Sequence, residues 1–185
     1  MAASEKILVI GPAWVGDMVM AQALLRLLRE RAPAAIIDVV GPAWSLPLTA
    51  RMAEVRRGVM LGAAHGELAL AERYRLARQL RPEQYTRAIV LPRSFKSALL
   101  PYLARIPVRT GFRAEARGWL LTDPRPLDRE ALDQTVKRFM ALGLPPGTPL
   151  PDPPAPALRV DETNRRALLA RFGLGRSAAV ALMPG

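Results

Sequence analysis

The first 110 residues alternate short apolar runs with longer stretches of helical period, and this alternation limits the fold more than any other feature of the sequence. Residues 6–11 (KILVIG) are almost continuously apolar, which is typical of a strand buried on both faces. In residues 17–31 apolar side chains recur at helical spacing, and arginines occupy the last turns. The pattern predicts a parallel sheet covered by helices on both faces.

The alternation continues through the next hundred residues. It predicts further strands at residues 35–41, 58–62, 86–92 and 108–112, and further helices at residues 66–80, 95–105 and 129–142. The run at 58–62 has the weakest strand pattern, and the helix at 95–105 includes Pro101. These elements suffice for one complete domain over residues 1–144.

Prolines dominate residues 145–156, which we interpret as a stiff, extended linker and a domain boundary. Beyond it, residues 161–172 have an acidic cap and helical spacing, and residues 178–183 have the pattern of a buried strand. We therefore expect residues 157–185 to begin a second domain that is largely missing. Because that strand would lack its neighbours, we expect this segment to be loosely held.

Composition excludes several classes of protein. Half of the 185 residues are hydrophobic, which is typical of a globular chain rather than a disordered one. There is no cysteine, so disulfides, thiolate zinc sites and thiol nucleophiles are excluded, and the single His65 cannot form a histidine cluster for a metal. No apolar run approaches the roughly 20 residues of a spanning helix, and the start lacks a secretory signal, so we expect a cytoplasmic protein.

The net charge of +11 and the pI of about 11.3 indicate a basic surface. Only three of the 27 cationic residues are lysines. A basic face can bind nucleic acid, phosphorylated sugars or an anionic membrane, and the arginine bias can also reflect base composition. Charge alone does not choose among these interpretations.

The loop after the first strand is the best-placed candidate site. Residues 11–17 (GPAWVGD) join the end of that strand to the start of a helix, where open α/β sheets bind ligands. The loop has Walker spacing, but Asp17 stands where a phosphate-binding lysine is needed, and Pro12 and Ala13 break the dinucleotide pattern. An acidic residue here favours a neutral hydroxyl group over a phosphate.

Asp17 itself has two interpretations that spacing cannot separate. An acid near a helix amino terminus stabilises the helix by about 0.3 to 1 kcal/mol. Alternatively, Asp17 is a general base that accepts the proton of an attacking hydroxyl group.

Several segments resemble a known family. They are GPAWVGDMVMAQ near the start, DVVGPAWSLPL after it, the AHG that contains His65, and VLPRSFKSALLPYLARIPVRTGFRAEARGWLL. In this order and spacing they are similar to the amino-terminal half of the bacterial lipopolysaccharide heptosyltransferases, in particular the heptosyltransferase II branch. The resemblance covers about residues 6–142, and SFKSAL and RTGFR are its most specific parts.

The resemblance implies the amino-terminal, Rossmann-like domain of a GT-B glycosyltransferase. Such enzymes transfer L-glycero-D-manno-heptose from ADP-heptose to the inner core of lipopolysaccharide, with inversion and without a metal or other cofactor. It implies that Asp17 is the general base and that this chain supplies the acceptor side. The implied partners are ADP-heptose, a phosphorylated Kdo-lipid A core and the inner face of the inner membrane, with no role for nucleic acid.

We expect an acceptor-binding set around Asp17, which comprises Trp14, Gly16, His65, Arg93, Ser94, Lys96, Ser97, Arg113 and Arg117. Among these, the arginines and Lys96 are candidates to pair with acceptor phosphates. Each cation can equally be a solvated surface residue, and His65 can be a loop residue without a chemical role. Trp14 and Trp44 either stack on a sugar or pack structurally, and packing is the favoured interpretation.

Two alternatives remain open from the sequence. The first is a basic nucleic-acid-binding α/β module, although the chain lacks the interleaved aromatic residues of single-strand binders. The second is an inactive truncated fragment, because the segment expected to bind the donor sugar nucleotide is missing.

Overall fold

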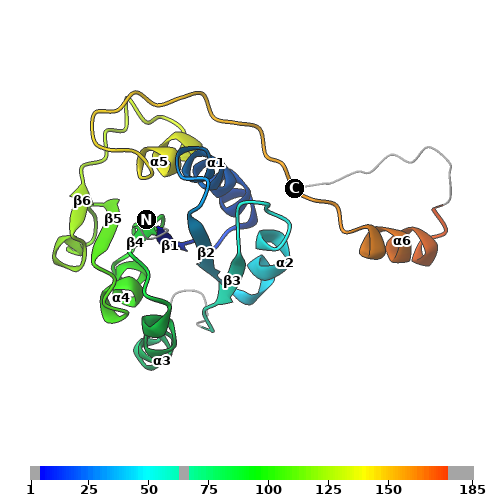
Figure 1. Cartoon of the computed structure of the whole chain (residues 1–185), viewed down its shortest axis with the longest axis horizontal. Coiled ribbons are helices and arrows are strands. Elements are labelled where there is room, and N and C mark those ends of the chain that lie inside the picture. The colour runs from blue at the N-terminus through cyan, green and yellow to red at the C-terminus, as the bar shows by residue number, and fades with distance from the viewer. Residues whose placement is uncertain (1–4, 63–66, 175–185) are drawn as a thin grey trace.

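The computed structural model describes residues 5–62 and 67–174, which contain a six-stranded, fully parallel sheet. The strands are β1 (Lys6–Ile10), β2 (Ile36–Gly41), β3 (Arg57–Met60), β4 (Arg87–Val90), β5 (Val108–Phe112) and β6 (Asp123–Arg125). They lie in the order β3-β2-β1-β4-β5-β6 (Figure 1). The prediction of a Rossmann-like α/β fold is confirmed.

The helices connect and cover these strands. They are α1 (Val15–Arg31), α2 (Leu46–Thr49), α3 (Leu70–Leu80), α4 (Phe95–Leu103), α5 (Thr135–Ala141) and α6 (Glu162–Arg171), with 3-10 turns η1 (Ala43–Ser45), η2 (Arg81–Glu83) and η3 (Gly118–Leu120). Helices α1 and α5 lie on one face of the sheet, and α3 and α4 lie on the other (Figure 1).

The central strands are apolar throughout because both of their faces are covered. In β1, Ile7 and Val9 pack against α1, whereas Leu8 and Ile10 face the helices on the other side. All four side chains are buried, as expected of a central strand in a parallel sheet. The continuous apolar run that predicts this strand is thus the direct consequence of its place in the sheet.

Two elements differ from the sequence expectation. Helix α5 begins at Thr135 instead of residue 129, because the carboxylate of Asp128 accepts hydrogen bonds from the backbone of Glu130 and Ala131 and forms a local turn. The short edge strand β6 was not expected, since its sequence Asp-Pro-Arg has no apolar alternation. The strand expected at residues 178–183 lies outside the described residues.

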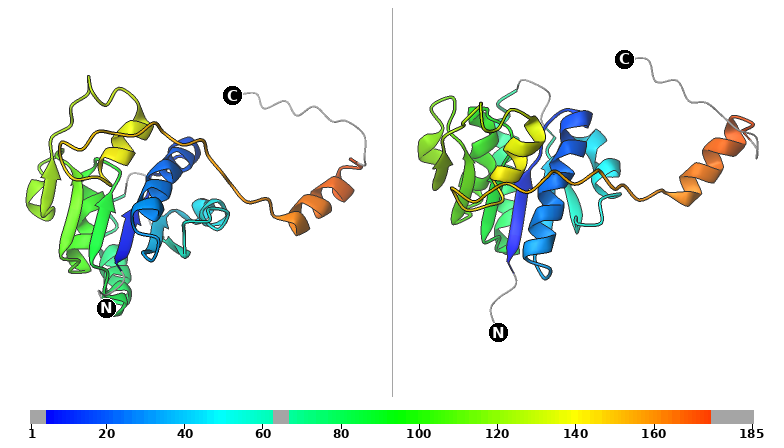
Figure 2. Two further views of the ribbon diagram at one scale, coloured as in Figure 1. Left: turned by 45° about the horizontal axis from the view of Figure 1, so that its top comes forward. Right: turned by 90° about the horizontal axis from the view of Figure 1, so that it is seen from above.

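The proline-rich segment is extended, as expected, but it is bound to the sheet domain and is not a free linker. Nε2 of Gln22 donates to the carbonyl oxygen of Ala157 at 2.7 Å, and the backbone N–H of Ala157 donates to Oε1 of Gln22 at 2.9 Å. Arg26 donates to the carbonyl of Ala155, and Met52 forms a β-bridge with Leu158. The segment crosses α1 before it reaches α6 (Figure 2).

Helix α6 follows this segment and has no buried residue. Its cap is as expected: the carboxylate of Asp161 accepts the backbone N–H of Asn164 at 2.9 Å. The assignment of residues 157–185 to a second domain stays a prediction. Within the described part of the chain, no helix is both long enough and apolar enough to cross a membrane.

A buried ionic network joins β2, β3 and the start of β4. Asp38 is fully buried and accepts hydrogen bonds from Arg56, Arg57 and the hydroxyl of Tyr85. Burial alone would raise the pKa of Asp38, but the hydrogen bonds from Arg56 and Tyr85 outweigh it and lower this pKa below its usual value. Burial and the bond to Asp38 raise the pKa of Tyr85 to about 12.

We predict that Asp38→Asn destabilises the protein by about 1 to 3 kcal/mol at pH 7, because the buried hydroxyl of Tyr85 and the partly exposed guanidinium groups of Arg56 and Arg57 lose their charged acceptor. Since the pKa of Asp38 is lower in the folded state, its contribution is complete above the unfolded pKa and is lost as pH falls through the folded pKa. In urea titrations the free energy of unfolding of the wild type should therefore fall below about pH 4, and that of Asp38→Asn should fall less. Exposed Asp152→Asn is the control; equal stability of the three proteins at pH 7 would contradict the prediction.

Candidate functional site

A cavity of about 700 Å³ lies at the carboxyl ends of β1, β2 and β4. Its walls come from the loops that follow these strands, with additional residues from α3 and α5. The chain leaves β1 toward β2 on one side, while β4 pairs with the other side of β1, so the strand order reverses between β1 and β4. Parallel sheets leave a crevice where their strand order reverses, and the cavity occupies that position.

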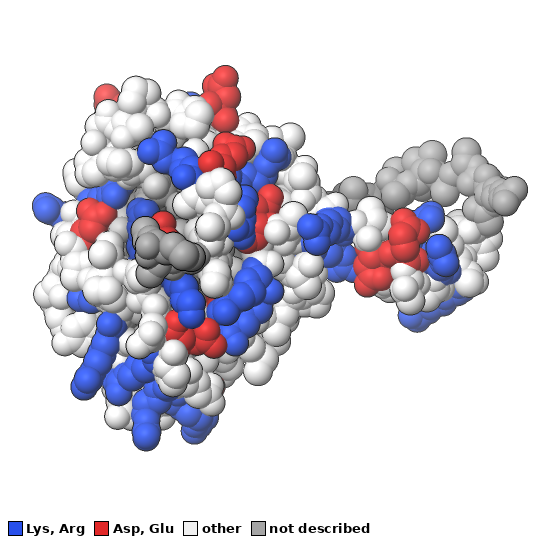
Figure 3. Space-filling model, viewed as in Figure 1, with Lys and Arg blue, Asp and Glu red and all other residues white. Residues whose placement is uncertain are grey.

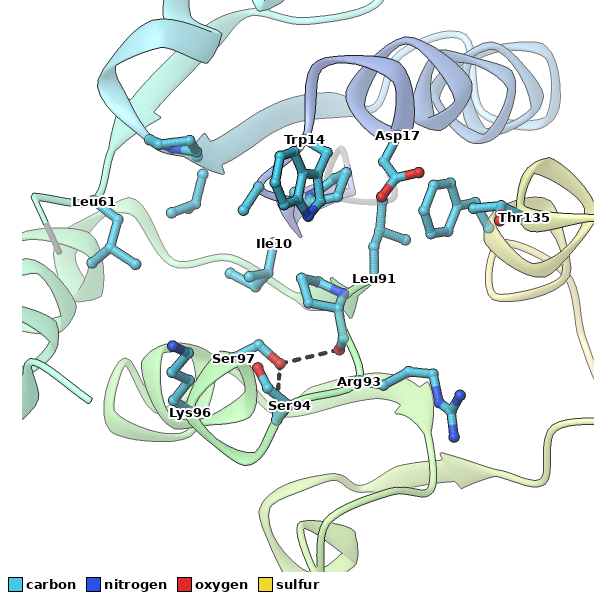
Figure 4. Close-up of a pocket in the computed structure, with 18 of the residues that line it drawn as sticks. Ile10, Trp14, Asp17, Leu61, Leu91, Arg93, Ser94, Lys96, Ser97 and Thr135 are labelled. Carbon is cyan, nitrogen blue, oxygen red and sulfur yellow. Dashed lines mark hydrogen bonds between the residues drawn. The ribbon is translucent and has the colours of Figure 1, made fainter. Parts of the chain in front are cut away.

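Asp17 lines the cavity from the first turn of α1. Its carboxylate lies between the Trp14 ring and Thr135 in the close-up (Figure 4). Helix α1 has Trp14 at its N-cap and no side-chain capping bond, so Asp17 does not close the helix through a hydrogen bond. Among residues 5–62 and 67–174, nothing forms a hydrogen bond or an ion pair with the Asp17 side chain, which leaves the carboxylate available to a ligand.

The two tryptophans that follow Pro-Ala are at the cavity and not in the core. Trp14 is 68% exposed and Trp44 is 41% exposed, and both line the cavity. Structural packing was the favoured interpretation from sequence, and the exposure of both rings is the opposite of that expectation. Exposed aromatic faces beside a cavity suit stacking on a sugar ring.

The loop between β4 and α4 and the first turn of α4 supply the opposite wall. Arg93, Ser94, Lys96 and Ser97 all line the cavity, and their binding of an acceptor stays a prediction. The Ser97 hydroxyl is buried and donates to the carbonyl oxygens of Ser94 and Pro92 at 2.6 and 3.1 Å (Figure 4). Arg93, in the loop, is exposed, and Lys96, in the first turn of α4, is partly exposed.

Arg117 is not on the surface where a phosphate-binding role requires it. Its side chain is fully buried and donates to the carbonyl oxygens of Phe112, Pro92 and Ser94 and to the hydroxyl of Ser97. Burial lowers the pKa of Arg117 to about 10, so the guanidinium is still charged at neutral pH. The structure thus gives this arginine a positioning role: it fixes the loop that presents Ser94 and Lys96 to the cavity.

The same loop is held from outside by Glu115. Its carboxylate accepts the backbone N–H of Phe95 at 2.7 Å, at the first turn of α4. Glu115 and Ala116 both have positive φ, at 45° and 53°, a conformation that costs non-glycine residues energy. The contacts of Glu115 and Arg117 hold the segment in this conformation.

The remaining members of the expected set lie elsewhere. Arg113 is exposed, does not line the cavity, and donates to the carbonyl oxygen of Pro124. Gly16 lies on the exposed side of the first turn of α1, where an added Cβ would meet nothing within 4 Å, and it does not line the cavity. His65 lies outside the described residues.

Sequence reasoning missed the residues contributed by α3 and α5. Arg73 comes from α3, and Thr135, Arg138 and Phe139 come from α5. No motif marks them, and their approach to the cavity depends on how the two helices pack on the sheet. Arg138 is internally bonded, since it donates to the carbonyl oxygens of Leu132 and Asp133.

We predict that Arg117→Met destabilises the protein by on the order of 3 kcal/mol, because five hydrogen bonds from a buried guanidinium to carbonyl and hydroxyl oxygens are lost. Arg117→Lys should recover only part of this, since an ammonium group cannot span carbonyls on two sides as a guanidinium does. Urea unfolding measures the stability of both variants. The exposed Arg129→Met is the control, and an unchanged midpoint for Arg117→Met would contradict the positioning role.

The chain matches known proteins along nearly its whole length. The pattern of glycosyltransferase family 9 (heptosyltransferase) matches residues 73–185. The chain is 49% identical over 175 residues to lipopolysaccharide heptosyltransferase 2 of Salmonella typhimurium, and equally to that of Escherichia coli. In both cases the match covers 91% of this chain and 50% of the relative, so the chain spans about half the length of these relatives.

Comparison with solved structures gives the same family as comparison of sequences. The E. coli ADP-heptose lps heptosyltransferase II matches with a TM-score of 0.79 and 45% identity, over 92% of this chain and 51% of that one. A glycosyl transferase family 9 protein from Veillonella parvula, 17% identical, shares the fold with a TM-score of 0.72, over 95% of this chain and 52% of that one. The resemblance drawn from the motifs is therefore confirmed, and the chain belongs to glycosyltransferase family 9, the heptosyltransferases.

Proposed function

We propose that this chain forms the acceptor side of an enzyme that transfers L-glycero-D-manno-heptose from ADP-heptose to the inner core of lipopolysaccharide. The observation that carries the proposal is the Asp17 carboxylate, which lines the cavity at the carboxyl edge of the sheet without a bonding partner among the described residues. Its half-buried position beside a large exposed aromatic ring suits a sugar hydroxyl. The relatives named as heptosyltransferases support the substrate class.

In the proposed reaction Asp17 is the general base. The acceptor hydroxyl oxygen attacks the anomeric carbon of the donor heptose, and its proton passes to the carboxylate. The bond from that carbon to the diphosphate oxygen breaks, and ADP leaves with the electron pair, so attack from the opposite face inverts the anomeric centre. Because carboxylates are weak bases for alcohols, proton transfer accompanies the attack.

The cationic wall of the cavity is proposed to bind the acceptor. Arg93 in the loop after β4 and Lys96 in the first turn of α4 line the cavity, and phosphate groups on a Kdo-lipid A core suit these two cations. Trp14 and Trp44 supply the aromatic surface for the sugar rings. The donor ADP-heptose is proposed to bind mainly to residues that this chain does not contain.

A lipid-linked acceptor requires the enzyme to work at a membrane surface, and we propose contact with the inner face of the inner membrane. Basic side chains gather over α3 at the lower edge of the space-filling view (Figure 3). Arg75 and Arg78 of α3, and Arg105 after α4, are exposed. Such a surface suits anionic lipid headgroups.

We predict that Asp17→Asn lowers the rate of heptose transfer by about 10²- to 10⁴-fold, because the amide cannot accept the proton. The measurement is the initial rate with ADP-heptose and a core acceptor, in a protein that joins this chain to a donor-binding half. Acceptor affinity, measured separately, should stay within a few-fold of the wild type. Glu30→Gln, exposed near the other end of α1, is the control; a full rate in Asp17→Asn would rule out the general base.

Metal independence is part of the same proposal. We expect that dialysis against EDTA leaves the rate of transfer unchanged, since the negative charge on departing ADP is assigned to protein donors and cations. A loss of activity that Mg²⁺ or Mn²⁺ restores would show that this part of the proposal is wrong.

A further inference from the structure

Arg73 is a buried cation without an acidic partner. It lies in the first turn of α3 and is only 4% exposed, yet it lines the cavity. Buried charges in proteins are almost always paired, because removing an ion from water is costly. The neighbouring acid in sequence, Glu72, is paired with Arg75 instead.

The guanidinium of Arg73 is only partly satisfied. Its Nε donates to the carbonyl oxygen of Leu68 at 2.7 Å, and no described residue accepts a hydrogen bond from its other two nitrogens. Within the described residues, every fully enclosed polar side-chain atom has a hydrogen-bond partner. The two free nitrogens therefore keep access to solvent, and the cavity that the residue lines provides it.

Burial lowers the pKa of Arg73, and no acidic group opposes this shift. An arginine nevertheless stays protonated at neutral pH. The free protein thus keeps a desolvated positive charge in its cavity, and an anionic ligand would relieve it.

The surroundings favour an anion with more than one charge. Among the residues that the structure describes, four cationic side chains line the cavity, Arg73, Arg93, Lys96 and Arg138, against the single acid Asp17. Arg73 and Lys96 come from the first turns of α3 and α4, which pack side by side on the same face of the sheet. The amino-terminal turns of helices add their partial positive charge to that of the two side chains.

Asp17 lies across the sheet from this pair. Helix α1, which carries Asp17, covers the face opposite to α3 and α4. A phosphoryl group held by Arg73 and Lys96 would be kept away from the carboxylate, and a neutral hydroxyl group of the same molecule could reach it. The two ends of the cavity therefore suit the two ends of a phosphorylated sugar.

From this geometry we propose that Arg73, with Lys96, binds a phosphoryl group of the sugar substrate in the cavity. The identity of that substrate rests on the proposed function, but the anion site itself does not. The phosphoryl group can belong to the phosphorylated acceptor or to the diphosphate of ADP-heptose, and the guanidinium fork fits either.

The first test uses inorganic phosphate and needs no sugar. Phosphate should raise the thermal unfolding midpoint of the wild type in a saturable manner, because it binds the folded state. Arg73→Met should lower the affinity for phosphate at least tenfold, and Arg73→Lys should restore part of it. Arg129→Met, which removes an exposed cation that does not line the cavity, is the control and should behave as the wild type. An Arg73→Met protein that binds phosphate as the wild type does, or a wild type that does not respond, would overturn the proposal.

The second test identifies the source of the phosphoryl group. Calorimetric titration compares a phosphorylated core oligosaccharide, its dephosphorylated form and ADP-heptose. An acceptor source predicts that Arg73→Met weakens binding of the phosphorylated oligosaccharide at least tenfold and leaves the dephosphorylated form unaffected. If the phosphoryl group belongs to the donor, Arg73→Met should weaken binding of ADP-heptose at least tenfold and leave both oligosaccharides unaffected.

The two proposals fail differently in these tests. If phosphate binds through Arg73 but neither sugar ligand binds or reacts, the anion site stands and the heptosyltransferase proposal fails. If a sugar ligand binds equally well to the wild type and to Arg73→Met, the function stands and the anion site is wrong.

Discussion

The parallel arrangement of the strands determines where the loops and the cavity of this molecule lie. Because all six strands run in one direction, their carboxyl ends and the loops that follow them gather at one edge of the sheet. The reversal of strand order between β1 and β4 separates two of these loops and leaves a cavity between them. Asp17 lies in the first turn of the helix after one loop and Lys96 in the first turn of the helix after the other, so the topology alone brings together residues that are far apart in sequence.

Three buried charged side chains differ in how their loss of hydration is compensated. Asp38 is neutralised by arginines within the sheet domain. Arg117 has no acidic partner in contact but uses its whole guanidinium on carbonyl oxygens and a hydroxyl group. Arg73 has neither arrangement, and it is the one of the three that lines the cavity. Asp38 and Arg117 stabilise the fold, whereas Arg73 keeps hydrogen-bond donors available in a cavity that a ligand can enter.

Much of the fold could be predicted from the sequence because its central strands are buried on both faces. Such strands, β1 above all, must be continuously apolar, and the helices between them must be amphipathic. The start of α5 was not predictable in this way, because a side chain to backbone contact of Asp128 competes with the helix. The edge strand β6 was missed since its three residues include a proline and bury little.

The site was predictable only where a motif or a strand end marked it. Asp17 and the loop of Lys96 follow predicted strands, so their position at the edge of the sheet could be inferred. Whether Asp17 caps its helix or faces a cavity depends on side-chain direction, which spacing does not encode. Arg73 and Arg117 look like ordinary surface cations in the sequence, and only the packing of α3 and of the segment after β5 buries them.

The attachment of residue 157 to α1 also determines where this chain could be joined to a different carboxyl-terminal half. Gln22 is fully buried, and its amide uses both its oxygen and its nitrogen on the backbone of Ala157. A chimera joined within the proline-rich residues 145–156 would replace Ala157. The buried amide of Gln22 would then lose its backbone partner, which is costly in the interior. The crossover point for exchanging halves is therefore beyond Arg159, whose backbone N–H is the last among residues 67–174 to bond back to the sheet domain, at the carbonyl oxygen of Arg51.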